Sequence, residues 1–170
     1  MSILTIRNCL DPILRQKCDP IENIDGNLVA LSQDMIETMF NAPGAGLAAN
    51  QVGIAQRIIV VDLGIGTDKI NPVAIVNPEI AAFEEEMTGE EGCLSIPDLF
   101  AEVKRARLVE LKGYDLDGNA VRYEAEDCLA RAFQHELDHL NGILFWDKLG
   151  KIKRDLLKRK FKKKLKEKSP

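Results

Sequence analysis

The heptapeptide Gln134-His135-Glu136-Leu137-Asp138-His139-Leu140 contains both histidines of this 170-residue chain. The apolar spacing from 125 to 140 predicts a helix across it. Because residues four apart share one face of a helix, the two imidazoles can bind a single metal ion. Cys128 and Ala132 lie on the same face and should line the adjacent pocket. Glu136 projects between this face and an apolar stripe, which predicts a buried carboxylate beside the metal.

Two imidazoles leave such a site incomplete, because catalytic metal sites usually have three protein ligands and one open position. The longer metalloprotease pattern H-E-x-x-H-x-x-G-x-x-H fails at Phe145, and the only Glu downstream is Glu167 in a basic tail. The third ligand should therefore lie upstream, where a thiolate is the natural candidate. Cys93 stands in a glycine-flanked segment, Glu91-Gly92-Cys93-Leu94-Ser95, from which it could reach the helix. A small buried hydrophobe is the competing interpretation of this cysteine.

The remaining segments predict an α+β chain whose middle is mostly antiparallel sheet. We expect an amphipathic helix from Asp25 to Phe40, followed by a loop and then a buried strand at 58–61. Another strand is expected within 74–83, and two more should flank the Asp-Gly turn within 103–124. Lys and Arg dominate a last predicted helix from Ile152 to Lys168.

Composition is that of an ordinary globular protein, with 45% apolar and 29% charged residues. The length suits one domain, and no apolar run approaches the ~20 residues of a membrane helix. The four cysteines are irregularly spaced, and the chain has the character of a cytoplasmic protein, so we expect no disulfide. The net charge of −4 is uneven, because residues 148–170 carry +10 and the rest −14. We therefore expect a single domain over 1–147 and a basic helical extension over 148–170 that meets a polyanion.

Three separated motifs resemble one family, the peptide deformylases, which are metal hydrolases that remove the formyl group from the initiator methionine of new polypeptides. Residues 44–51 match the family's G-x-G-L-A-A-x-Q, residues 91–95 match E-G-C-L-S, and residues 134–140 match Q-H-E-x-D-H-L. The resemblance implies an α+β fold in which antiparallel β-sheets pack around a central metal-binding helix. It also implies one divalent metal ion per chain, with Fe²⁺ as the native ion and Zn²⁺, Ni²⁺ or Co²⁺ as substitutes.

The expected chemistry of the 1–147 domain is metal-assisted hydrolysis. Cys93, His135 and His139 would hold the ion, and Glu136 would act as general base toward a metal-bound water. The resemblance places the Gln51 amide and the Leu94 backbone N–H at the oxyanion. The residues expected to border the substrate are Gly44, Ala45, Gly46, Gly92, Cys128 and Ala132. Many relatives carry a larger aliphatic residue in place of Ala45, so the cleft is expected to be locally wider.

Other interpretations remain open at this point. A zinc peptidase with an unusual third ligand would use the same residues, and a catalytically inactive, metal-stabilised binding protein would need the ligands alone. Retention of Glu136 argues against the inactive protein, because a structural metal site needs no base. The segment 44–51 also fits a loose dinucleotide fingerprint or a plain structural turn. A dinucleotide motif must leave a strand and open a helix, and the order here is reversed.

Two further features extend the expectation. Asp138 lies about 100° around the helix from His139, so it cannot be a fourth metal ligand. We expect it to anchor the helix by an ion pair with a cation, for which Arg105 is the candidate. The alternative is a solvated surface carboxylate. Some deformylases carry a similar basic helix that docks on ribosomal RNA. We therefore expect formyl-methionyl nascent peptides and the ribosome as partners, with no DNA or membrane, for a monomer in the cytoplasm. A solubilising terminus or a membrane-surface helix are alternatives for the tail.

Overall fold

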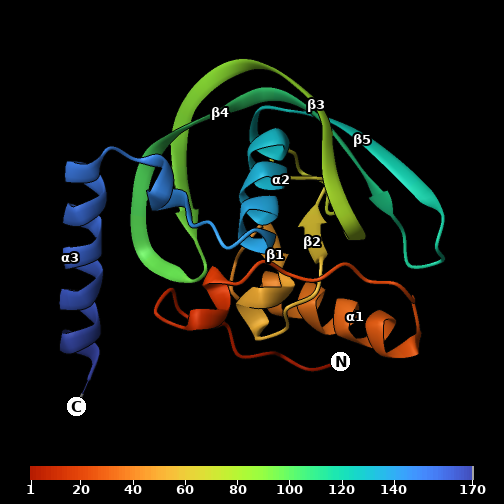
Figure 1. The fold of residues 1–170 in the computed structure, drawn as a ribbon, viewed down its shortest axis with the longest axis horizontal. Coiled ribbons are helices and arrows are strands. Elements are labelled where there is room, and N and C mark those ends of the chain that lie inside the picture. The colour runs from red at the N-terminus through yellow and green to blue at the C-terminus, as the bar shows by residue number, and fades with distance from the viewer. Residues whose placement is uncertain (170) are drawn as a thin grey trace.

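The computed structural model describes residues 1–169 as an α+β fold with one five-stranded antiparallel sheet and three α-helices (Figure 1). The strands lie in sequence order across the sheet: β1 (Gly46–Ala48), β2 (Ile58–Asp62), β3 (Pro72–Cys93), β4 (Ile96–Tyr114) and β5 (Ala120–Glu126). The helices are α1 (Gly26–Asn41), α2 (Asp127–Leu140) and α3 (Lys151–Lys168), with short 3-10 turns η1 (Pro12–Arg15), η2 (Ala49–Val52) and η3 (Phe145–Lys148). The predicted α+β class is confirmed.

Helix α2 lies inside the curve of the sheet, and the long strands β3 and β4 arch around it (Figure 1). Its apolar stripe packs into a cluster with the inner faces of the strands, as the helical spacing predicted. The stripe consists of Leu129, Phe133, Leu137 and Leu140. A helix buried in this way presents its other face, which carries both histidines, to the opposite side of the fold.

Strand β2 is buried on both faces, which explains its uninterrupted β-branched sequence. Ile59 and Val61 face the α2 cluster. Ile58 and Val60 point to the other side, where they pack with Met35 and other residues of α1. The sheet therefore joins two apolar clusters, and α2 is held against its centre.

The structure corrects three sequence expectations. The segment expected to be a loop contains β1, whose three residues pair with β2 from Gly46↔Val61 to Ala48↔Ile59. Strand β3 continues to Cys93, far beyond the predicted 74–83, because it pairs with β4 along its outer half. The exposed glutamates in this half give the strand no apolar pattern from which it could be predicted. The resemblance implied several sheets, and the described chain forms one, because β1 to β5 pair in unbroken order.

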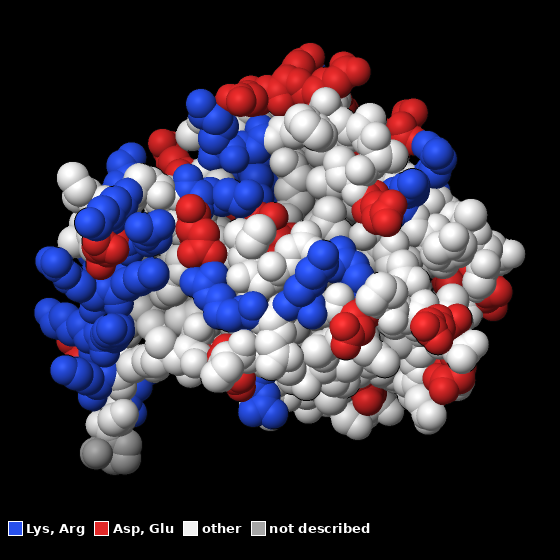
Figure 2. All heavy atoms as spheres, viewed as in Figure 1, with Lys and Arg blue, Asp and Glu red and all other residues white. Residues whose placement is uncertain are grey.

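Helix α3 rests on the body through part of its apolar stripe. Leu157 and Phe161 are buried beside Trp146, whereas Ile152 and Leu156 are 86% and 51% exposed. Most of the Lys and Arg residues of this helix are exposed, and they form a dense basic surface in Figure 2. Acidic side chains gather instead over the bend of β3 and β4 at the top of that view. None of the helices in the described part of the chain is long and apolar enough to cross a membrane.

Candidate metal centre and substrate cleft

Cys93, His135 and His139 converge although they come from two distant parts of the chain. Cys93 ends β3, and the two histidines are buried on the face of α2 that does not carry its apolar stripe. The Cys93 Sγ lies 3.2 Å from the His139 Nε2, and the two histidine Nε2 atoms are 3.1 Å apart. One atom from each of the three residues falls within 4.8 Å of the others. A thiolate and two imidazole nitrogens facing one point are a donor set that fits a divalent transition metal.

The other cysteines are placed differently. Cys9 and Cys18 are buried, and burial raises the pKa of their thiols to about 12 and about 11. Cys128 is exposed at the start of α2 and lines the cleft described below, as the helix pattern predicted. All four cysteines of the described chain are free thiols.

The buried carboxylate of Glu91 is hydrogen-bonded to His135 and to two arginines. It accepts a hydrogen bond from the His135 Nδ1 at 2.7 Å, two from Arg105 at 3.0 and 2.7 Å, and one from Arg131 at 3.1 Å. Burial would raise the pKa of Glu91, but the hydrogen bonds and charges of His135 and Arg105 hold that pKa well below its usual range. A proton kept on Nδ1 leaves the Nε2 lone pair of His135 free for a metal.

The sequence analysis did not assign Glu91 or Arg131 a role. Arg131 is a charged residue among the apolar residues 129–133 of α2, which is the signal that could have pointed to it, whereas Glu91 follows a run of other glutamates on β3 and carries no such signal. The expected link between Asp138 and Arg105 is confirmed, because the Arg105 Nη1 lies 2.5 Å from the Asp138 Oδ2. Arg105 therefore ties β3 to α2 through two carboxylates.

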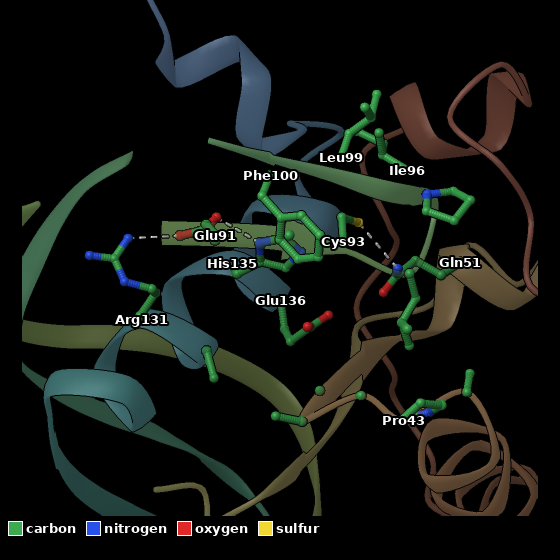
Figure 3. A pocket seen from close by; sticks show the side chains of 18 of the residues that line it. Pro43, Gln51, Glu91, Cys93, Ile96, Leu99, Phe100, Arg131, His135 and Glu136 are labelled. Carbon is green, nitrogen blue, oxygen red and sulfur yellow. Dashed lines mark hydrogen bonds and ion pairs between the residues drawn. The ribbon is translucent and has the colours of Figure 1, made fainter. Parts of the chain in front are cut away.

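Glu136 points into the cleft from α2 (Figure 3). It is only 4% exposed, and its Oε2 has no hydrogen-bond partner within the described chain. Burial raises the pKa of Glu136 to about 7, and the nearby charge of Glu91 acts in the same direction. A Cβ at Gly46 would lie 2.6 Å from the Glu136 Oε1, so only glycine lets β1 pass this close.

Gln51 faces the same space from η2. Its Oε1 accepts a hydrogen bond from the Ala48 N–H at 2.9 Å, and this bond orients the side-chain amide. In that orientation the Nε2 donates a hydrogen bond to the Ser95 Oγ at 3.1 Å and lies 3.7 Å from the Cys93 Sγ. The neighbouring residue Asn50, which the sequence analysis did not single out, donates from Nδ2 to the His139 carbonyl at 2.5 Å. Segment 49–52 is therefore bonded to the carboxyl end of α2.

A cleft of about 650 Å³ opens in front of these side chains, a size typical of small-ligand sites. Glu136, His135, Cys93, Gln51 and Leu94 all line it, whereas His139 lies behind and is 1% exposed. The six residues expected at the substrate also line it: Gly44, Ala45, Gly46, Gly92, Cys128 and Ala132. The structure thus brings every candidate residue to one cleft or to the ligand cluster at its base.

Comparison with known proteins gives a single answer. The family model described as polypeptide deformylase matches residues 3–155. A peptide deformylase of Syntrophobacter fumaroxidans is 52% identical over 98% of each chain. A crystal structure of a peptide deformylase from Legionella pneumophila superposes with a TM-score of 0.91 at 41% identity, covering 99% of this chain and 100% of that one.

A second solved structure is also similar to this chain. The peptide deformylase of Ehrlichia chaffeensis in complex with actinonin is 38% identical, with a TM-score of 0.89 over 96% of this chain and 98% of that one. Family, relatives and structures agree with the three motifs in the sequence. The chain belongs to the polypeptide deformylase family, hydrolases that remove the formyl group from the N-terminal methionine of new polypeptides.

Proposed function

We propose that this chain deformylates nascent peptides with Cys93, His135 and His139 as metal ligands and Glu136 as general base. One observation carries the assignment. The unpartnered carboxylate oxygen of Glu136 is buried and faces the cleft at whose base the thiol and the two imidazoles converge. An uncompensated buried carboxylate is costly, so its position favours a role in proton transfer.

The donor set suits one divalent ion per chain. When bound, the ion would polarise the formyl carbonyl and make a water acidic enough to attack at neutral pH. One thiolate and two imidazoles accommodate Fe²⁺, which we assign as the native ion, and also Zn²⁺, Ni²⁺ or Co²⁺. Glu91 supports the site by keeping the His135 imidazole in one orientation.

Glu136 moves the proton. Its carboxylate accepts a proton from the attacking water and returns it to the amine nitrogen, which is otherwise a poor leaving group. Burial raises the pKa of Glu136, which makes its carboxylate a stronger base toward the attacking water. The Gln51 Nε2 and the Leu94 backbone N–H stabilise the oxyanion formed from the formyl oxygen. The bond from the Gln51 Oε1 to the Ala48 N–H holds that donor in place.

The peptide binds along β1. This strand is at the edge of the sheet, so one side of its backbone can pair with an extended peptide. Gly44, Ala45 and Gly46 form this side of the cleft. Gly92, Cys128 and Ala132 complete the lining that receives the substrate.

Formate release tests this assignment. The full chain is assayed anaerobically on a formyl-methionyl peptide, loaded with iron and again with zinc or nickel. We expect one formate per peptide and no cleavage of internal peptide bonds. Internal cleavage would favour the zinc peptidase, and metal binding without any hydrolysis would favour an inactive binding protein.

Residues 1–147 form the catalytic part of a cytoplasmic monomer, and 148–170 form a basic extension that contacts ribosomal RNA. The cations of α3 support this, because phosphates attract them while repelling an acidic body. The exposed Ile152 and Leu156 are too few for strong membrane binding, and we propose no DNA partner.

The ribosome contact is tested without disturbing the packing of α3. Lys153, Arg159 and Lys160 are exposed, so a triple Gln variant should weaken co-sedimentation with ribosomes and flatten its salt dependence. The matched control places Gln at three exposed lysines of the body, Lys17, Lys69 and Lys112. Equal binding by the two variants would make α3 a solubilising terminus.

A further inference from the structure

Asn50 is a fully buried polar residue in the short turn that also carries Gln51. It is 0% exposed and does not line the cleft. Its Nδ2 donates a hydrogen bond to the His139 carbonyl at 2.5 Å. A buried amide is stable only where it is hydrogen-bonded, so this contact keeps the side chain in one place. Asn50 therefore holds the backbone of His139 from a position that the substrate does not reach.

The carbonyl that Asn50 contacts lies in the last turn of α2. The final four carbonyls of a helix have no partner within the helix itself. The His139 carbonyl also accepts a hydrogen bond from the Gly142 N–H at 3.0 Å, so the turn that ends the helix already supplies it with one donor. The Asn50 amide thus adds a second bond, and this bond attaches η2 to the helix that carries both histidines.

The side chain of Gln51 takes its position from the backbone of the same turn. Its Oε1 accepts a hydrogen bond from the Ala48 N–H at 2.9 Å, and its backbone carbonyl accepts one from the Arg7 N–H at 2.7 Å. Figure 3 shows the amide beside Cys93, whose Sγ lies 3.7 Å from the Gln51 Nε2. A shift of η2 would therefore move this amide relative to the ligand cluster.

Asn50 and Gln51 are adjacent, so the hydrogen bond of one restrains the other. Consecutive Cα atoms are about 3.8 Å apart at a fixed distance, and a displacement of Asn50 passes to Gln51 with little loss. A displacement of about 1 Å in a catalytic group can cost about 10²-fold in rate. The bond to the His139 carbonyl is consequently short and direct enough to set how far the Gln51 amide lies from the histidine ligands.

We propose that Asn50 is a positioning residue that fixes the Gln51 amide relative to the metal centre through its bond to the His139 carbonyl. The inference rests on the proposed function, because it takes Gln51 as an oxyanion donor and His139 as a ligand. Asn50 acts on the transition state through Gln51 and touches no substrate, so its effect falls on kcat and leaves KM unchanged.

The test is a double-mutant cycle on the metal-loaded protein with a formyl-methionyl peptide. Asn50→Ala should lower kcat about 10–100-fold and change KM by less than about twofold. In the Gln51→Ala background the same substitution should cost no more than about twofold further, because the donor that it positions is already gone. Asn50→Ser keeps a shorter donor and should retain more activity than Asn50→Ala. If the Ala variant does not fold, as checked by urea unfolding, the Ser variant enters the same cycle.

Metal binding gives a readout that needs no turnover. Asn50→Ala should still hold one divalent ion per chain by metal analysis, since Cys93, His135 and His139 are all retained. Its metal affinity in chelator competition should fall by less than about tenfold, below the range expected for a group that orients an imidazole ligand. A larger loss of affinity would mean that Asn50 acts on the metal site itself and would overturn the proposal.

Arg57→Ala is the matched control. The Arg57 Nη1 donates a hydrogen bond to the Leu140 carbonyl, the next one along the same helix end, at 3.2 Å, and Arg57 does not line the cleft. This variant should keep kcat within about twofold of the parent's. An equal loss in Arg57→Ala, or a loss from Asn50→Ala that is the same with and without Gln51, would refute the positioning role. Absence of formate release by the parent protein would instead overturn the function proposed above.

Discussion

Replacement of Glu91 by Ala should destabilise the protein by about 3–5 kcal/mol, the usual cost of removing one partner from a buried ion pair. The Glu91 side chain is 5% exposed, and the side chains of Arg105 and Arg131 are 4% and 10% exposed. Four hydrogen bonds to two guanidiniums and one imidazole would be lost together. Asp138 would then remain as the partner of Arg105, whereas Arg131 would have no carboxylate partner among the described residues.

The assay is urea unfolding of the metal-loaded protein, paired with chelator competition for the metal. With an m-value of about 2 kcal/mol/M, the loss should lower the unfolding midpoint by about 1.5–2.5 M. Apparent metal affinity should fall by about 10–100-fold, because Glu91 holds the His135 ring through Nδ1. Glu91→Gln keeps the shape of the side chain and should fall between Ala and the parent protein.

Glu86→Ala serves as the control. It removes a carboxylate from the same strand, but its partner Lys104 is exposed, so the midpoint should not move measurably. A loss below about 1 kcal/mol for Glu91→Ala, with unchanged metal affinity, would refute the claim that this carboxylate holds the two arginines and the histidine.

Three other predictions follow from the structure. Cys93→Ala should abolish stoichiometric metal whereas Cys128→Ala should retain it, as measured by metal analysis, and full metal in Cys93→Ala would disprove the ligand assignment. Glu136→Ala should keep the metal but lose about 10²–10⁴-fold in kcat, and activity above a tenth of the parent's would rule out a general base. Asp147→Asn should cost about 0.5–1 kcal/mol at pH 7, since Asp147 receives hydrogen bonds from Arg15 and the Leu144 N–H. Burial would raise the pKa of Asp147, but the hydrogen bonds and charge of Arg15 outweigh burial and lower this pKa. The stabilisation that Asp147 gives to the folded protein is therefore fully present above the unfolded-state pKa of about 3.9, and it is lost as the pH falls further. The difference between the unfolding midpoints of the two proteins should therefore shrink as the pH falls below about 3.9, and a difference that does not shrink there would contradict this reading.

The helices and the local chemistry of α2 could be predicted from the sequence. His135, Glu136 and His139 needed only the period of an α-helix to place them near one another, and the apolar stripe that includes Phe133 placed them on the opposite face. The choice of Cys93 as third ligand came from the absence of any downstream candidate, and the motif around it supported the choice. These inferences depend either on residues a few positions apart in one helix or on the exclusion of other candidate ligands.

Strands were harder to delimit because pairing supports segments that have little apolar pattern of their own. The outer half of β3 carries exposed glutamates, and β4 alone accounts for its extended form. Strand β1 has only three residues, which is too short for alternation to be recognised.

What the sequence by itself determined was the family, the class of chemistry, and the side chains that share the histidine-bearing face of α2. Only the tertiary structure decided that Glu91 lies behind His135 with two arginines, and that Asn50 donates a hydrogen bond to the His139 carbonyl. Glu91 and His135 are 44 positions apart in the chain. Helical periodicity relates residues within a few turns, whereas contacts across such distances depend on how β3 and β4 bend around α2, which packing of the whole core determines.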